Sequence, residues 1–176
     1  MDSTGYKEKP EKKNATKWAK GKQMAMANIM FTWSNKFSST TGLRVKYGYL
    51  LAPRFMVGAG SSIRLGFPKR NGNNWYYFNA NLFCRYYLTK SRVSLYPQLT
   101  TGYANESGYF GLHAWRNTFG IGSNIYLSNR HTLEINFAPL FFDLGRAYKN
   151  NRNYNDREYM TGFDFDQMYI GLSYHF

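Results

Sequence analysis

The sequence predicts an all-β protein, a closed eight-stranded antiparallel up-and-down transmembrane β-barrel. Three observations predict it. Apolar and polar residues alternate with a period of two through eight stretches between residues 23 and 176. The connections between these stretches alternate between short turns and longer segments. Aromatic residues make up 19% of the chain, and a membrane barrel uses such amphipathic rings in its two interfacial girdles.

The composition excludes several other classes of protein. No run approaches the roughly 18 consecutive apolar residues of a membrane-spanning helix. The single cysteine, Cys84, excludes an internal disulfide and a cysteine-based zinc site. We therefore expect no metal and no cofactor.

The chain divides into a basic tail and a barrel. Residues 1–22 are rich in lysine and lack periodicity, so they predict a flexible N-terminal tail. Residues 23–176 carry the alternation and form the expected transmembrane β-barrel. A barrel must be exported, so we expect a leader that has been removed.

The first four expected strands cover residues 24–36, 42–51, 54–67 and 75–88. In the first, one phase consists of alanine, isoleucine and aromatic residues. In the second, apolar residues alternate with Arg44 and Lys46. In the third and fourth, they alternate with glycine, serine, asparagine, Arg64 and Arg85.

The other four expected strands cover residues 92–104, 114–127, 131–143 and 164–176. Their polar phases contain mainly Ser, Thr, Gln, Asn, Gly and Tyr, together with Glu134. Pro97 and Pro139 fall inside two of these strands, and each removes a hydrogen-bond donor from the ladder. Because a closed barrel has no free edge, we expect a bulge or a local gap at each proline.

The lengths of the connections predict an orientation. Tight turns are expected at residues 52–54, 89–91 and 128–130, and longer loops at 68–74, 105–113 and 145–162; only 37–41 is short on the loop side. Short periplasmic turns and longer extracellular loops are typical of outer-membrane barrels. With eight strands, both termini then lie on the periplasmic side, and the basic tail with them.

The polar phase decides which face meets lipid. A soluble, ligand-binding barrel would expose a face rich in Lys and Glu, whereas here that phase suits a narrow, crowded lumen. The few charged residues in it form an expected lumen polar network: Arg44, Lys46, Arg64, Arg85 and Glu134. Aromatic residues near the expected strand ends predict the girdles: Trp33, Phe67, Trp75, Tyr76, Tyr103, Trp115 and Phe141 on the loop side, and Phe55, Tyr86, Tyr126, Tyr174 and Phe176 on the turn side.

Two segments resemble a known family. The last strand resembles the C-terminal signal that the barrel assembly machinery recognises, a terminal aromatic residue preceded by apolar residues at every second position: Met168, Ile170, Leu172, Tyr174 and Phe176. The segment 83–88 before a tight turn is typical of small eight-stranded outer-membrane barrels of the OmpA transmembrane-domain and OmpX type, which residues 23–176 resemble throughout. The resemblance implies a bacterial outer-membrane location and a plugged barrel, often without enzymatic activity.

The strongest alternative function is a lipid A-modifying barrel enzyme, an acyl hydrolase or acyltransferase that uses His and Ser with a carboxylate. The three histidines are His113, His131 and His175, and none forms a His-x-Ser pattern. We therefore expect no enzyme and assign no catalytic residue. A narrow channel is a further alternative.

The net charge of +13 raises the question of an anionic partner. Several basic residues fall on the expected extracellular side and could bind lipopolysaccharide phosphates, or could simply keep the loops soluble: Lys69, Arg70, Arg116, Arg146, Lys149, Arg152 and Arg157. Nucleic acid is not expected, because the basic residues are not interleaved with aromatic residues on one face. We expect a structural or adhesive protein, or an accessory subunit that contacts other outer-membrane proteins through its loops or tail.

Overall fold

The computed structural model describes residues 19–33, 38–68, 74–89, 91–107, 110–149, 158–163 and 168–176. Its regular elements within these ranges are the strands β1 (Gln23–Trp33), β2 (Ser38–Ala52), β3 (Phe55–Pro68), β4 (Trp75–Tyr86), β5 (Val93–Ser107), β6 (Phe110–Tyr126), β7 (His131–Lys149), β8 (Glu158–Phe163) and β9 (Met168–His175). No helix in the described ranges is long and apolar enough to cross a membrane.

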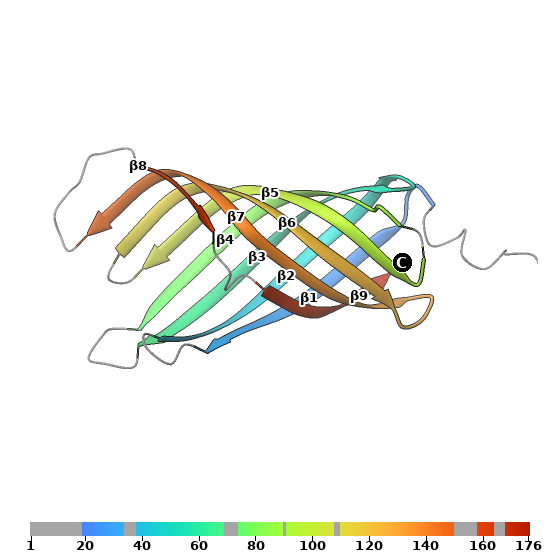
Figure 1. Ribbon diagram of the computed structural model, residues 1–176, viewed down its shortest axis with the longest axis horizontal. Coiled ribbons are helices and arrows are strands. Elements are labelled where there is room, and N and C mark those ends of the chain that lie inside the picture. Colours follow the sequence, from blue (N-terminus) through green and yellow to red (C-terminus); the bar gives the residue numbers. More distant parts are fainter. Residues whose placement is uncertain are drawn as a thin grey trace, which may run out of the picture.

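The strands close into a barrel (Figure 1). From β1 to β7, each strand pairs antiparallel with the next along the chain. The last strand, β9, pairs with β1 on one side and with the first half of β7 on the other. Since β8 pairs with the second half of β7, β8 and β9 share the eighth position around the barrel. The predicted closed, eight-stranded antiparallel up-and-down barrel is confirmed.

The two ends of the barrel differ. The short connections after β2, β4 and β6 lie at the same end as Phe176, which we call the turn end (Figure 1). The opposite end, where β2 begins at Ser38 and β5 ends at Ser107, is the loop end. The first strand starts at the turn end, because Met24 pairs with His175.

Several expected strand limits are wrong at the loop end. Residues 105–113 and 145–162 were expected to be loops, but strands β5 to β8 occupy much of both segments. The β6–β7 ladder continues to the pair Phe110–Lys149. The reason is that strict apolar alternation is needed only where one face is apolar, whereas the backbone ladder can continue through the polar sequence beyond it.

Pro139 interrupts its ladder, as predicted, whereas the β5–β6 ladder continues unbroken through the pair Pro97–Ile121. Between the pairs Phe119–Leu140 and Ile121–Phe137, β7 contains one more residue than β6, so Pro139 lies in a β-bulge. The β4–β5 ladder ends at the pair Arg85–Gln98, one residue before Pro97. The missing amide hydrogens are thus accommodated by local gaps in the pairing.

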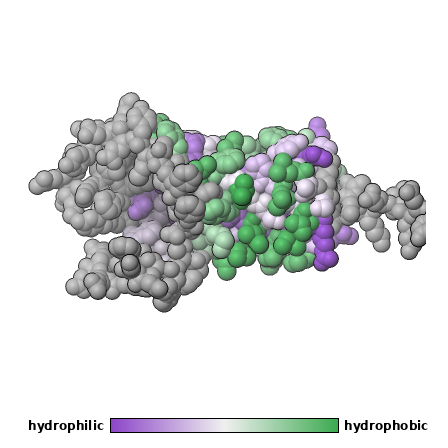
Figure 2. Space-filling model, viewed as in Figure 1, coloured by the Kyte–Doolittle hydropathy of each residue, from purple (hydrophilic) through white to green (hydrophobic). Residues whose placement is uncertain are grey.

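The polarity of the barrel is inside out. Large apolar side chains project from the outer surface along the described strands, and Figure 2 shows them as a band that gives way to hydrophilic residues towards the turn end. The buried, inward-facing side chains include Lys46, Arg64, Arg85, Glu134 and several asparagines. The inward phase is therefore the polar one, as the alternation predicts.

Candidate functional site

The lumen is filled at its turn end by an apolar cluster. Its members are Met24, Met26, Leu50, Met56, Phe83, Tyr87, Tyr96 and Tyr126, all buried. The expected place of Tyr126 in the outer girdle is wrong, because it shares the inward phase of Asn124, and its ring contacts His175 with the ring centroids 5.4 Å apart. The cluster itself was not predicted, although Met24 and Met26, two positions apart on β1, were its signal in the sequence.

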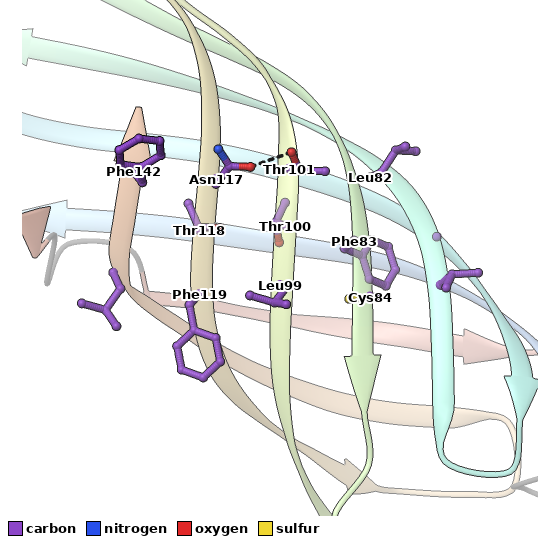
Figure 3. A pocket seen from close by; sticks show the side chains of 13 residues that line it. Leu82, Phe83, Cys84, Leu99, Thr100, Thr101, Asn117, Thr118, Phe119 and Phe142 are labelled. Atoms are coloured by element: carbon purple, nitrogen blue, oxygen red, sulfur yellow. Dashed lines mark hydrogen bonds between the residues drawn. The ribbon is translucent and has the colours of Figure 1, made fainter. Parts of the chain in front are cut away.

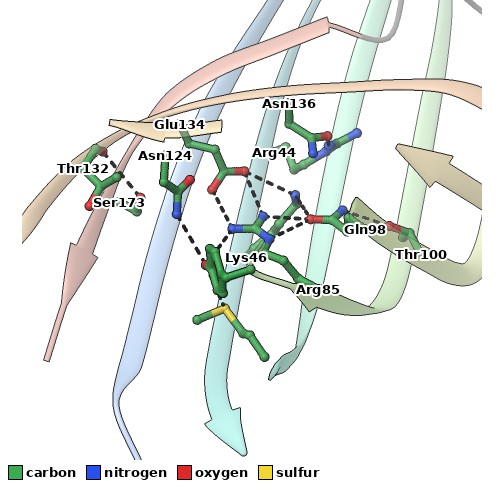
Figure 4. Close-up of polar contacts among 12 residues, drawn as sticks. Arg44, Lys46, Arg85, Gln98, Thr100, Asn124, Thr132, Glu134, Asn136 and Ser173 are labelled. Carbon is green, nitrogen blue, oxygen red and sulfur yellow. Dashed lines mark hydrogen bonds and ion pairs between the residues drawn. The ribbon is translucent and has the colours of Figure 1, made fainter. Parts of the chain in front are cut away.

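A buried ion pair crosses the lumen beside this cluster. Arg85 on β4 donates from Nη1 to Glu134 Oε2 at 3.2 Å and from Nη2 to Glu134 Oε1 at 3.1 Å, and neither side chain is exposed (Figure 4). This two-bond geometry is the strongest arrangement between a guanidinium and a carboxylate. The pair crosses the lumen and joins β4 to β7, two strands that are not neighbours in the barrel.

Other polar groups form hydrogen bonds or ion pairs with the two members of this pair. Lys46 Nζ lies 3.6 Å from Glu134 Oε1, and Lys46 also donates to Gln98 Oε1 at 3.4 Å. The same Gln98 oxygen accepts from Arg85 Nε and Nη2 at 3.2 and 2.7 Å. Arg85 Nη1 donates to the hydroxyl of Tyr87 at 3.3 Å, and its guanidinium lies 3.8 Å from the ring centroid of Tyr96. A buried ion pair is tolerated when further hydrogen bonds satisfy its remaining donors and acceptors, as they do here.

Two further arginines lie on aromatic rings rather than on carboxylates. The guanidinium carbon of Arg44 is 3.3 Å from the ring centroid of Tyr169, and Nη1 donates to Asn136 Oδ1 at 3.3 Å. The guanidinium carbon of Arg64 is 3.9 Å from the ring centroid of Tyr77. The structure therefore brings Lys46, Arg85 and Glu134 into direct contact and places Arg44 and Arg64 beside them in the same lumen.

Glycines make room for the charged side chains. In the ladder, Gly42 pairs with Arg64 and Gly60 with Lys46. A Cβ on Gly42 would meet Arg64 Cγ at 2.8 Å, and one on Gly60 would meet Lys46 Cγ at 2.9 Å. The aliphatic stems of these cations thus lie across the neighbouring strand where a side chain is missing.

The residues expected to contact lipopolysaccharide are not brought together in the described part. Arg116 has an inward position, with Nη1 donating to the Tyr77 hydroxyl at 3.3 Å, so it belongs to the lumen rather than to the outer surface. Arg146 and Lys149 lie on β7 near the loop end. Lys69, Arg70, Arg152 and Arg157 lie outside the described residues. Lipopolysaccharide contact by these six residues stays a prediction.

The histidines occupy separate places. His113 faces outward, and its Nδ1 lies 2.7 Å from the Tyr103 hydroxyl. The Nε2 atom of His175 lies 2.6 Å from the Thr132 hydroxyl, and Nδ1 of His131 lies 3.1 Å from the Ser128 hydroxyl at a turn. Within the described ranges, no cluster of three His, Cys, Asp or Glu side chains could hold a metal ion.

The outer surface carries a shallow groove of about 840 Å³ across β3 to β7 (Figure 3). Its lining is largely apolar, with Leu82, Leu99 and Phe119 among it. The polar groups there bond to one another: the Thr101 hydroxyl donates to Asn117 Oδ1 at 2.7 Å and accepts from Trp115 Nε1 at 2.8 Å. Such mutual pairing suits a surface that faces no water.

The C-terminal residues alternate as expected. Met168, Ile170, Leu172 and Phe176 are exposed on the outer surface, whereas Tyr169 between them is buried.

Proteins of known structure share this fold. No protein-family model and no curated protein sequence matches the chain. Among the solved structures that it resembles is the outer membrane protein OprG from Pseudomonas aeruginosa, at 14% identity and a TM-score of 0.58, with 89% of this chain and 96% of that chain covered. Neisserial surface protein A (NspA) gives 11% identity and a TM-score of 0.59, with 88% and 96% covered.

A third solved structure, the Yersinia pestis outer membrane protein Ail, gives 12% identity and a TM-score of 0.51, with 90% of this chain and 100% of that chain covered. These likenesses show the fold. The chain has the fold of the small eight-stranded outer-membrane β-barrels, as its resemblance to the OmpA and OmpX type implies.

Proposed function

We propose that this barrel is an integral protein of the bacterial outer membrane, without an open pore, that acts as a structural, adhesive or accessory subunit. The observation that carries the proposal is the inverted polarity: a bonded ion pair inside, and exposed leucine, isoleucine and aromatic side chains outside. Water would make this arrangement costly, whereas lipid favours it. The fold shared with outer-membrane proteins supports the same location.

The orientation follows from the two ends of the barrel. Short turns face the periplasm in outer-membrane barrels, so we place the turn end and both termini in the periplasm. The loop end then faces outward and offers the surface for other outer-membrane proteins or for lipopolysaccharide. We also propose that β9, with its alternating outward side chains, is the segment that the assembly machinery recognises.

A first test concerns the folded state in detergent. Protein extracted from outer membranes should migrate differently on a gel when it is boiled and when it is not, because the closed ladder resists detergent until it is heated. The circular dichroism spectrum of the unboiled form should be rich in β-structure. A protein that is soluble without detergent and runs as one band under both conditions would contradict the proposal.

A second test concerns the absence of a pore. The apolar cluster closes the turn end of the lumen and the Arg85–Glu134 pair crosses the lumen beside it. We therefore expect no stepwise single-channel conductance in planar bilayers. The double variant Met56→Gly/Tyr96→Gly, which removes two fully buried side chains of the cluster, should admit small ions. Conductance steps in the unaltered protein would favour the narrow channel instead.

A further inference from the structure

The lumen contains a small cavity between the ion pair and the loop end. Its volume is about 20 Å³, enough for one water molecule or an ion of similar size. Four cationic side chains line it: Arg44, Lys46, Arg64 and Arg116. The rest of the lining is neutral, and no Asp or Glu of the described residues belongs to it.

At least two of the cations that line this cavity are not paired with a carboxylate of the described residues. Glu134 pairs with Lys46 and Arg85. Neither Arg44 nor Arg64 has a carboxylate within ion-pair distance among the described residues. On adjacent strands Arg44 pairs with Ser62 and Arg64 with Gly42, so the two arginines are diagonal neighbours on the lumen face.

Arg64 also contains a buried donor without an acceptor among the described residues. Only 9% of this residue is exposed, and its Nε atom has no hydrogen-bond partner within the described chain. The Nε atom of Arg44 is likewise buried without a partner there. Ring stacking fixes both guanidinium groups but accepts none of their N–H bonds. Two neighbouring cations whose Nε groups are buried without an acceptor in the described part of the chain favour a bound counter-ion.

We propose that the lumen binds one small inorganic anion, the size of a halide ion, between Arg44, Lys46 and Arg64. The small volume of the cavity favours a halide ion over a larger oxyanion. Since the apolar cluster closes the turn end, the anion enters from the loop end. The site is a dead end that fixes an anion beside Arg44 and Arg64, which form no ion pair with a carboxylate of the described residues.

The direct test uses the full chain folded in a non-ionic detergent. Chloride binding should broaden the ³⁵Cl NMR line of the solution, and bromide should compete for the site. Equilibrium unfolding in urea should shift in parallel: at a chloride concentration of a hundred times Kd, the unfolding constant should fall about a hundred-fold relative to sodium gluconate of equal ionic strength. Phosphate should give no such shift.

Arg64→Gln should abolish the difference between chloride and gluconate, whereas Arg54→Gln, at an exposed turn position, should preserve it. Equal line widths and equal unfolding constants in chloride and gluconate for the unaltered protein would overturn the proposal without any variant. A chloride effect that persists in Arg64→Gln, or that Arg54→Gln removes, would also overturn it, since the anion would then bind elsewhere.

Discussion

Replacement of Glu134 by alanine should lower the free energy of unfolding by about 3–5 kcal/mol, the usual effect of breaking a buried ion pair by removing one partner. The carboxylate is fully buried and contacts both Lys46 and Arg85. Its loss leaves two buried cations that share the acceptor Gln98 Oε1 and have no carboxylate between them. Urea unfolding in detergent micelles, followed by tryptophan fluorescence, measures the change.

A double-mutant cycle separates the loss of the pair from a general loss of packing. Glu134→Leu and Arg85→Met should each be strongly destabilising, because each leaves a charge behind. The double variant Glu134→Leu/Arg85→Met should be less destabilised than the sum of the two, with a coupling of about 1–3 kcal/mol. Additive effects within about 0.5 kcal/mol would show that the two side chains do not act as a pair.

The alternation was sufficient to predict the fold because every strand is subject to the same constraint on its outward side chains. Lipid selects an apolar side chain at each outward position, so the phase can be read strand by strand without knowing the neighbours. The signal fails where that selection ends. At the loop end, β7 runs on to Lys149 through a polar sequence, and the expected loop at residues 145–162 was too long.

The partners inside the lumen could not be predicted in the same way. Alternation shows that Arg85 and Glu134 both face inward, but 49 positions separate them in the chain. Whether two inward side chains meet depends on the stagger of the strands around the barrel. This stagger cannot be derived from the sequence of any single strand. The alternation therefore selects the members of the network, and only the closed barrel shows that Arg85 meets Glu134 while Arg64 lies on Tyr77.

The positions of the inward glycines could have helped to predict which strands the charged side chains contact. Each of the pairs Gly42–Arg64, Gly60–Lys46 and Gly171–Glu134 places a missing side chain opposite a charged one. A Cβ on Gly171 would come within 2.1 Å of the Ala27 carbonyl oxygen, so that position tolerates no larger residue without moving β1. Gly42 and Gly60, by contrast, mark places where the stem of a long charged side chain crosses the neighbouring strand.

The second large effect is expected on the outer surface, at Leu82. This side chain is 61% exposed and lies midway along the outward phase of β4. In a bilayer, Leu82→Arg should destabilise the barrel by about 2–4 kcal/mol, because the guanidinium would lie near the midplane of the hydrocarbon. Unfolding from phospholipid vesicles, followed by tryptophan fluorescence and by the boiled-against-unboiled gel shift, measures the loss.

The matched control is Leu88→Arg, which makes the same chemical change in the same phase at the turn end. Leu88 is 53% exposed, so the two positions differ mainly in depth along the barrel. Near an interface the cost should fall to about 0–1 kcal/mol, because the arginine can extend its charge into water. A soluble barrel would tolerate arginine equally at both positions, since both are exposed. The difference in stability between the two variants therefore tests whether lipid surrounds β4. A large difference requires lipid there, and equal, small effects would mean that water surrounds the strand.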